Sequence, residues 1–262
     1  MTDPIPGPRN WVLPVVTVAL SLLGVGALVA AVLMPSPPTA TGAVVSAAPS
    51  PTAAPVVRVT PTADPSEEAD ASTGGISELV DAAWVERVAA EPSIPERALA
   101  AYAGASLAVS RTQPACGLGW NTIAAIGHVE SEHGTIGGSQ IGADGVATPA
   151  IVGIALDGSR TLEVRDTDGG ALDGDAEWDR AVGPLQFIPE TWVQYGRDGN
   201  GDGVVDIHQI DDAALTAAEY LCVAGGDLTT DEGWIAAVNA YNPSVEYNNR
   251  VAEAANHYAT LR

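Results

Sequence analysis

Lysine is absent from this sequence of 262 residues, so all of its basic side chains are arginines. Eleven arginines face 33 acidic residues, and the formal net charge is −22. From Asp64 onward, nine arginines stand against 32 acidic residues, a balance of −23. A chain this acidic repels phosphate backbones and anionic headgroups, which argues against nucleic acid or anionic lipid as its main partner. The folded part must tolerate this repulsion or hold a cation.

Cysteine is also scarce, and the only two are Cys116 and Cys222. An even number of cysteines in an exported domain predicts a disulfide, and both residues lie beside or within helical patterns. Closing a loop of about 100 residues would stabilise the fold by roughly 4 to 5 kcal/mol in the chain-entropy model. Two buried free thiols are the alternative, and intact mass before and after reduction and alkylation separates the two.

Charge is missing altogether from residues 11–33, which are mostly apolar. A run of that length crosses a hydrocarbon core of about 30 Å as a helix, and a cleaved signal peptide has only roughly 7 to 15 apolar residues. We therefore predict a retained transmembrane anchor, with a cleaved signal or a buried core helix as alternatives. Arg9 precedes the run and the next basic residue is Arg58. This bias predicts that residues 1–10 are cytoplasmic and that the rest of the chain faces the cell envelope.

Residues 34–75 lack helical or strand periodicity and consist mainly of Pro, Ala, Thr, Ser and Val. This composition predicts a disordered, partly polyproline linker. Residues 76–262 then form one domain, long enough to bury a hydrophobic core. Apolar residues at spacings of three and four predict helices within 76–134, whereas the stretch 135–180 is rich in Gly and Asp and predicts short strands or loops. The predicted fold class is mainly α, with a minor β part.

One carboxyl group falls on the apolar face of the predicted helix near residue 130. Glu130 follows two isoleucines of that face at spacings of three and four, whereas Glu132 lies about 200° further round and faces solvent. Burial disfavours the charged form of a carboxyl group and raises its pKa toward the range of a general acid. A helix-end glutamate paired to an arginine is the alternative. His128 and His133 do not have the spacing of a zinc pair and are interpreted as surface or helix-end residues.

Oxygen-bearing side chains alternate at the start of "DGNGDGVVDIHQIDD", residues 198–212, as in an EF-hand loop. Gly203 permits the sharp turn that such a loop requires. The pattern then departs, because Gln209 stands at position 12, where a bidentate glutamate is expected. Asp211 and Asp212 follow and could complete the ligand shell. We predict a calcium site, with a solvated acidic turn as the alternative.

Four segments in this order resemble one known family. They are "HVESEHG", "AVGPLQFIPETW" at residues 181–192, the Asp-rich loop leading into "DIHQIDDAA", and "AVNAYNPSVEYNNRV". Together they resemble the lytic transglycosylases of the membrane-bound lytic murein transglycosylase B (MltB-like) type, in the lysozyme-like superfamily. The resemblance covers about residues 78–260 and implies a mainly α, α+β lysozyme-like catalytic domain.

The resemblance implies an enzyme that cleaves the β-1,4 bond between N-acetylmuramic acid and N-acetylglucosamine in peptidoglycan, leaving a 1,6-anhydromuramyl end. It implies that Glu130 is the catalytic acid and base and that Ser131 helps to position substrate or acid. It implies that Gln186 lines the sugar groove and that Tyr241 and Asn242 lie in the segment that closes over the acid. Without the resemblance, Gln186, Tyr241 and Asn242 could equally be ordinary turn residues.

The resemblance further implies a structural Ca²⁺ and no organic cofactor. Its ligands would be Asp198, Asn200, Asp202 and Asp212 with the carbonyl of Val204. The implied partners are peptidoglycan glycan strands and, through the N-terminal helix, the membrane. Two other functions stay open, a muramidase that uses water in place of the sugar's 6-hydroxyl and a non-catalytic, calcium-stabilised wall-binding module. The acidic stretch 165–179 resembles an insertion loop near the groove or is a mobile surface loop, and no ligand is assigned to it.

Overall fold

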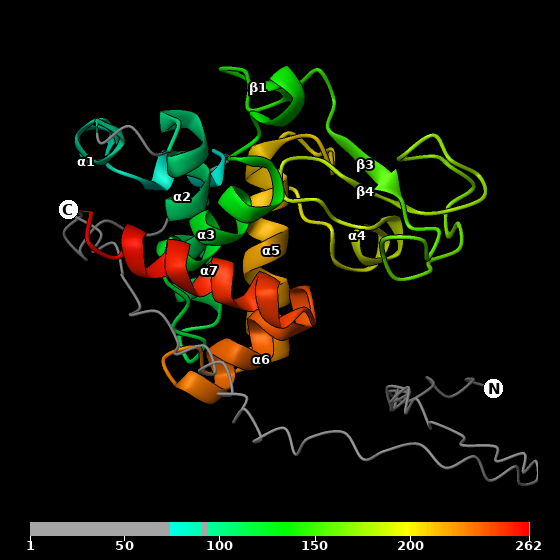
Figure 1. Cartoon of the computed structure of the whole chain (residues 1–262). Helices are drawn as coiled ribbons and strands as arrows, with labels where there is room; N and C mark the ends of the chain where they lie inside the picture. The colour runs from blue at the N-terminus through cyan, green and yellow to red at the C-terminus, as the bar shows by residue number, and fades with distance from the viewer. Residues whose placement is uncertain (1–73, 91–93, 262) are drawn as a thin grey trace, which may run out of the picture. The chain divides into compact units, whose positions relative to one another are not determined.

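The computed structural model describes residues 74–90 and 94–261 (Figure 1). The predicted cytoplasmic segment 1–10 and the predicted anchor 11–33 lie outside the described residues, as does all but the last part of the predicted linker 34–75. Within the described ranges, no helix combines the length and the apolar character needed to cross a bilayer. The predictions of an anchor and a linker therefore stay predictions.

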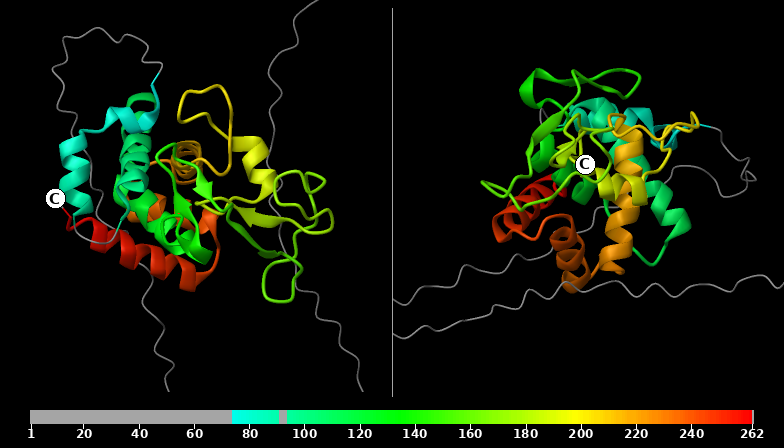
Figure 2. Two further views of the ribbon diagram at one scale, coloured as in Figure 1. Left: turned by 90° about the horizontal axis from the view of Figure 1, so that it is seen from above. Right: turned by 90° about the vertical axis from the view of Figure 1, so that its right-hand side faces the viewer.

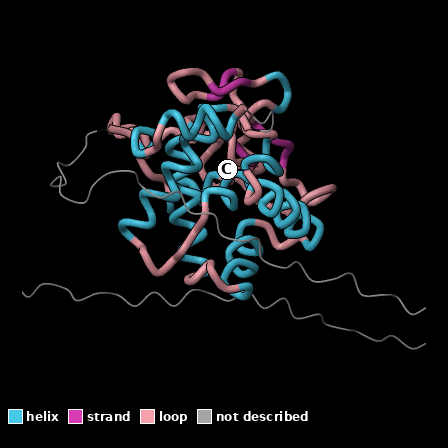
Figure 3. Tube along the Cα trace, turned by 90° about the vertical axis from the view of Figure 1, so that its left-hand side faces the viewer, coloured by secondary structure: helices cyan, strands magenta, loops and turns pink. Residues whose placement is uncertain are grey.

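The described part of the chain is mainly helical, as the sequence predicts (Figure 3). Its α-helices and 3₁₀ helices are η1 Ile76–Leu79, α1 Ala82–Ala89, α2 Glu96–Thr112, α3 Trp120–Ser131, η2 Ile136–Gly138, α4 Pro189–Tyr195, α5 Ile210–Gly225, α6 Asp231–Tyr241 and α7 Val245–Tyr258. Several begin at a side-chain cap, since Asp81, Thr230 and Ser244 accept backbone N–H bonds at the starts of α1, α6 and α7. These caps satisfy amides that have no partner inside the helix.

The stretch between α3 and α4 holds the short strands that its Gly- and Asp-rich composition predicts. The antiparallel pairs are β1 Gln140–Ile141 with β2 Ala147–Thr148, and β3 Val152–Ala155 with β4 Arg180–Val182. In Figure 3 the strands and the long loops gather to one side of the helices. The acidic stretch 165–179 is the second part of the long connection, 156–179, that returns the chain from β3 to β4.

Small side chains build the centre of the domain. Helices α2 and α5 pack against each other, and both are rich in fully buried alanines, namely Ala98, Ala101, Ala105, Ala213, Ala214, Ala217 and Ala218. Short side chains allow two helix axes to approach closely. Gly104 of α2 allows a second close approach, to η1, because a Cβ on that residue would lie 2.2 Å from the carbonyl oxygen of Ile76.

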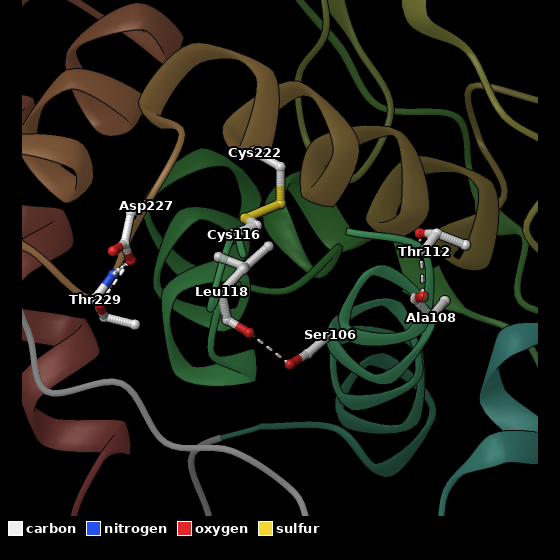
Figure 4. Close-up of a disulfide and its surroundings, with 8 residues drawn as sticks. All are labelled: Ser106, Ala108, Thr112, Cys116, Leu118, Cys222, Asp227 and Thr229. Carbon is white, nitrogen blue, oxygen red and sulfur yellow. Dashed lines mark hydrogen bonds between the residues drawn. A yellow bond between two sulfur atoms is a disulfide. The ribbon is translucent and has the colours of Figure 1, made fainter. Parts of the chain in front are cut away.

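A disulfide joins the loop before α3 to the last turns of α5 (Figure 4). Cys116 and Cys222 have Cα atoms 5.3 Å apart and lie 106 residues apart in the sequence. The Ser106 hydroxyl donates a bond of 2.9 Å to the carbonyl of Leu118 in the same loop. The predicted disulfide is confirmed, so Cys116 and Cys222 are not free thiols.

Helix α7 packs antiparallel against α3 (Figures 1 and 2). Trp120 at the start of α3 stacks on Tyr258 near the end of α7, with ring centroids 6.5 Å apart. Because the two helices run against each other, the last turn of α3 meets the first turn of α7. This contact brings Glu130 to Tyr247, although 117 residues separate them.

Candidate active site

Glu130 lies in the last turn of α3 and is half-buried. The Tyr247 hydroxyl donates a hydrogen bond of 2.6 Å to Glu130 Oε1, and Oε2 accepts none from the described residues. Desolvation raises the pKa of Glu130 to about 7, although the Tyr247 bond and the charge of Arg250 act in the opposite direction. Near neutral pH this carboxyl group is therefore divided between its acid and its base form.

Glu132, two residues further on, is exposed. It ends α3 in the left-handed region, with φ of 52°, and His133 and Gly134 follow with φ of 61° and 81°. Three successive left-handed residues turn the chain sharply back under the helix. Glu130 is half-buried and Glu132 is exposed, which agrees with their predicted positions on the helix, whereas the catalytic role of Glu130 stays a prediction.

This turn buries His133, which is only 2% exposed. Its Nε2 lies 2.9 Å from the Tyr258 hydroxyl and its Nδ1 lies 3.4 Å from the Tyr102 hydroxyl. Burial lowers the pKa of His133 to about 3, so the imidazole is neutral. The interpretation as a surface residue is right for the exposed His128 and wrong for His133, because the left-handed turn carries the ring beneath α3.

Ser131 joins the end of α3 to the segment 181–192. Its hydroxyl donates to the carbonyl of Pro184 and accepts a bond of 2.8 Å from the amide of Gly134. The side chain is 1% exposed, so its contacts in this structure are with protein. Ser131 thus fixes the position of Glu130 relative to the Pro184 turn.

Gln186 lies in a tight turn that the segment 181–192 forms. Val182 and Phe187 exchange backbone hydrogen bonds of 2.8 and 3.0 Å, which closes the turn, and Gln186 has φ of 48°. A left-handed conformation costs free energy for a residue other than glycine, and such strain is typical of functional sites. The side-chain amide donates to the carbonyl of Gly183 at 2.9 Å.

A pocket of about 220 Å³ adjoins this turn and is lined by Gln186, Phe187, Ile188, Thr191, Tyr220, Ala240 and Tyr241. The Tyr241 hydroxyl donates a bond of 2.8 Å to the carbonyl of Leu185, at the floor of the same turn. Burial raises the pKa of Tyr241 well above its usual value, and the negative charge of Glu130 raises it further. Tyr241 therefore lines the pocket and lies within electrostatic reach of the candidate acid, which is not itself a lining residue.

Asn242 has a different role from its neighbour. Its side-chain oxygen accepts a bond of 3.0 Å from the amide of Ser244, and its carbonyl accepts one of 2.8 Å from Asn248. These contacts shape the turn that leads into α7. Of the predicted site residues, Ser131, Gln186 and Tyr241 thus meet at one turn, with Glu130 directly before Ser131. Asn242 ends α6 and lies in the turn before the helix that carries Tyr247.

Tyr247 is the residue of this site that sequence reasoning missed. It lies in the predicted segment "AVNAYNPSVEYNNRV", but no local pattern distinguishes it from the tyrosine six residues earlier. Burial raises the pKa of Tyr247 well above its usual value, so the hydroxyl keeps its proton and donates a hydrogen bond to Glu130. Among the described residues, the groups that shift the pKa of Glu130 are Tyr247 and Arg250, and neither is a carboxylate.

The loop 198–212 keeps the oxygen pattern that predicts calcium. Asp198 accepts bonds of 2.7 and 2.8 Å from two glycine amides, Asn200 accepts one of 2.9 Å from the Asp202 amide, and Asp202 accepts one of 2.7 Å from the Val204 amide. Asp212 accepts three backbone amides at 2.7 to 3.2 Å. Burial and the charge of Asp198 raise the pKa of Asp212, with burial the larger cause. A donor set of oxygens alone fits a hard cation such as Ca²⁺.

The departure at position 12 has a structural reason. Gln209 caps α5, because its side-chain oxygen accepts the amides of Asp211 and Asp212. Asp211 pairs with Arg97 and accepts the hydroxyl of Ser77, which leaves it turned away from the loop. Of the two late carboxylates, Asp212 is therefore the one that faces Asp198.

The acidic stretch 165–179 brings together three other carboxylates. Oxygens of Asp166, Asp168 and Asp179 all lie within 4.8 Å of one another. Asp179 is fully buried and accepts the amide and the hydroxyl of Thr167 at 2.9 and 2.8 Å. Backbone amides of the stretch likewise donate to Asp166 and Asp168. The carboxylates thus organise the stretch by bonding its own backbone.

A family model described as the transglycosylase SLT domain matches residues 82–261. Among solved structures, the Escherichia coli lytic transglycosylase Slt35 in complex with bulgecin A is 15% identical, with 72% of this chain and 79% of that chain covered and a TM-score of 0.39. The same Escherichia coli protein in complex with calcium is 16% identical, with 72% and 80% covered and a TM-score of 0.40. No curated protein matches the chain. The family match, which spans most of the described residues, is the informative finding.

Proposed function

The chain belongs to the family of transglycosylase SLT domains, and from that premise we propose that it is a lytic transglycosylase of the MltB-like type with a lysozyme-like fold. In this proposal it cleaves the β-1,4 bond between N-acetylmuramic acid and N-acetylglucosamine and leaves a 1,6-anhydromuramyl end. The observation that carries the proposal is the desolvated carboxyl group of Glu130, held by Tyr247, with no second carboxylate acting on it among the described residues.

The first step is proton donation to the leaving oxygen. A carboxyl group with a pKa of about 7 is a good acid near neutral pH, since a large fraction carries the proton and gives it up readily. Tyr247 holds Oε1, so Oε2 is the oxygen that meets the glycosidic oxygen. The bond between the anomeric carbon and that oxygen then breaks as the proton arrives.

The second step uses the same group as a base. The Glu130 carboxylate takes the proton of the muramyl 6-hydroxyl, whose oxygen forms the new bond to the anomeric carbon. Atoms balance without water, because one proton has moved from the 6-hydroxyl to the leaving oxygen. An attacking group on the same sugar has a high effective concentration, so it replaces the second carboxylate of ordinary glycosidases.

The remaining residues of the site have supporting roles in this proposal. Gln186, in its strained turn, and Tyr241 line the pocket in which a sugar would lie, and Tyr241 is the lining residue whose pKa responds to the charge of Glu130. Ser131 holds the turn against α3. A non-catalytic wall-binding module would have no need for a carboxyl group with a raised pKa among these residues.

We assign calcium a structural role in the proposal. Asp198, Asn200, Asp202 and Asp212, with the carbonyl of Val204, would hold the ion and offset the repulsion between Asp198 and Asp212. The loop lies directly before α5, which packs on α2 at the centre of the domain. The ion would thus stabilise the fold and take no part in the chemistry.

The position in the cell is also a proposal. The uncharged run 11–33 supports a single membrane anchor, and the Pro-rich residues that follow support a tether. The catalytic domain would then act on the cell wall from the outer face of the cell membrane. The partner of the site is the peptidoglycan glycan strand.

The mass of the products tests the proposed reaction. Purified peptidoglycan is digested with the full-length chain, kept in a mild detergent because of the apolar run, and the released muropeptides are weighed. Transglycosylation gives anhydro products, each lighter by one water than the hydrolysis product. Products at the hydrolysis mass would assign a muramidase, and no release would contradict both enzymatic functions.

A further inference from the structure

A groove of about 340 Å³ lies between the C-terminal half of α3 and the outer face of α7. Its polar lining comes from His128 on α3 and from Arg250, Glu253 and His257 on α7, and Val129 forms part of its wall. In Figures 1 and 2 these two helices run side by side, so the groove follows their seam. It is separate from the pocket at Gln186, with which it shares no lining residue.

The groove gathers basic groups on a chain that has few. The formal net charge is −22 and the sequence holds four histidines, yet two of them line this groove together with an arginine. Within the described ranges, Arg97, Arg165, Arg180 and Arg197 are each paired with a carboxylate. Arg250 forms no ion pair with the described residues, like Arg87, Arg111 and Arg160, and it is the unpaired arginine that lines this groove. An unpaired guanidinium beside two imidazoles is suited to an anion.

The groove also adjoins the candidate acid. The positive charge of Arg250 lowers the pKa of both Glu130 and Tyr247, so the guanidinium lies within electrostatic reach of the two groups. Val129 is the residue directly before Glu130. A ligand in the groove that pairs with Arg250 would therefore lie within electrostatic reach of Glu130.

The chemistry of the substrate identifies an anion for this place. The hydroxyl and acetamido groups of the peptidoglycan sugars are neutral. The negative charge lies on the lactyl side chain of each muramyl residue, either as a free carboxylate or, where that carboxyl group is amide-linked to a peptide stem, at the carboxylates of the stem. We propose that the groove between α3 and α7 binds the carboxylate-bearing peptide stem of the strand that the active site cleaves. This inference rests on the proposed function and adds to it a preference for peptide-bearing strands.

Each polar residue has a defined part in the recognition. Arg250 offers its planar guanidinium to a stem carboxylate in a bidentate pair, which fixes direction as well as affinity. His128 and His257 donate from opposite walls of the groove. Glu253, one turn from Arg250, accepts from the amide or ammonium groups that a peptide stem also carries.

Binding without turnover tests the inference. The full-length Glu130→Gln chain is titrated by calorimetry with a disaccharide of the two wall sugars that carries a tetrapeptide, and with the same disaccharide whose lactyl carboxyl group is capped as a neutral methylamide in place of the peptide. We expect the peptide-bearing compound to bind about tenfold more tightly, as one charge-assisted contact provides. Adding Arg250→Ala should reduce this ratio to about one, and His257→Ala should reduce it in part. Because the Glu130→Gln background has no ionisable group at position 130, Arg250→Ala cannot act there through the pKa of the acid.

Arg111→Ala is the matched control, since Arg111 is an exposed arginine in the last turn of α2, outside both pockets. It should keep the tenfold ratio. Equal binding of the two compounds, or a ratio that survives Arg250→Ala, would overturn the inference. So would inorganic phosphate that displaces the peptide-bearing compound at equal concentration, because the groove would then be a phosphate site.

The two proposals fail separately. A chain whose Glu130→Gln form binds the peptide-bearing compound through Arg250, but whose native form releases nothing from peptidoglycan, would refute the proposed function and keep the groove. A chain that releases anhydro products without any preference for peptide would keep the function and refute the groove.

Discussion

The end of α3 and the loop 198–212 both contain a carboxyl group whose pKa is raised by burial. At α3, Glu130 accepts one hydrogen bond, from a tyrosine hydroxyl, and one of its oxygens has no partner among the described residues. In the loop, Asp212 accepts three backbone amides through both oxygens and faces the charge of Asp198. The same physical cause therefore prepares two different functions. In the proposed function, Glu130 passes a proton to the substrate, whereas Asp212 is a ligand of the cation.

The largest effect expected at either region is that of Glu130→Gln. Gln cannot donate a carboxylic proton or accept one, so we expect release of muropeptides to fall by about 1,000-fold or more, as for loss of a general acid. Glu132→Gln is the control, because that carboxyl group is exposed two residues away. Muropeptide release by Glu130→Gln at the rate of the native chain would remove Glu130 from the mechanism.

The contrast between these two glutamates could be predicted from the sequence, because helical periodicity alone decides which side chain faces inward. The disulfide followed from the count of cysteines, and the mainly α class from apolar spacing. Each of these features depends on residues close in sequence or on composition. They are the part of the fold that local physical rules determine.

The surroundings of Glu130 depend on contacts between distant segments, which periodicity does not describe. Tyr247 reaches Glu130 only because α7 crosses α3, and His133 is buried only because Glu132 and His133 adopt left-handed conformations. A glycine such as Gly134 signals such a conformation in a sequence, but Glu and His do not. The convergence of Asp179 on Asp166 likewise needs the fold of the whole stretch.

The second effect concerns the loop. Asp212→Asn replaces an oxygen by an amide nitrogen that cannot accept backbone N–H bonds, so we expect the free energy of unfolding to fall by about 2 to 3 kcal/mol. Calcium should raise the melting temperature of the native chain and a chelator should lower it, whereas the variant should respond to neither. Melting curves by circular dichroism measure this. A native chain that ignores both additions would refute the calcium site.

The same loop has a predicted dependence on pH. Without calcium, burial raises the pKa of Asp212 above that of the unfolded chain, so its folded form binds a proton more tightly. Its contribution to stability is then present at acidic pH and is lost as the pH rises through its folded pKa. Calcium favours the ionised form and should remove this loss. Chemical unfolding at a series of pH values, with and without the ion, measures the difference.

Asp168→Asn tests whether the cation binds in the stretch 165–179 or in the loop 198–212, and its expected effect on the free energy of unfolding is smaller. Asp168 is partly exposed and bonds to amides of its own stretch, so we expect a loss of about 1 kcal/mol or less. The stabilisation by calcium should remain, because the loop 198–212 is intact. If this variant abolished the response and Asp212→Asn kept it, the cation site would lie in the stretch 165–179 instead.

The smallest expected effect concerns the hydrogen bond that distinguishes Glu130 from Asp212. Tyr247→Phe removes a bond that lowers the pKa of Glu130, so that pKa should rise further above 7. The proposed acid is active when protonated, so the activity of the native chain should fall as the pH rises past about 7. In the variant, whose Glu130 has a higher pKa, the same fall should occur at a higher pH. The maximal rate should also drop by about tenfold or less, because Oε1 is no longer held in position. Tyr195→Phe, which removes a hydroxyl away from Glu130, is the control for kcat and the pH profile. A slower variant with an unchanged pH profile would show that Tyr247 fills space at this site without tuning the acid.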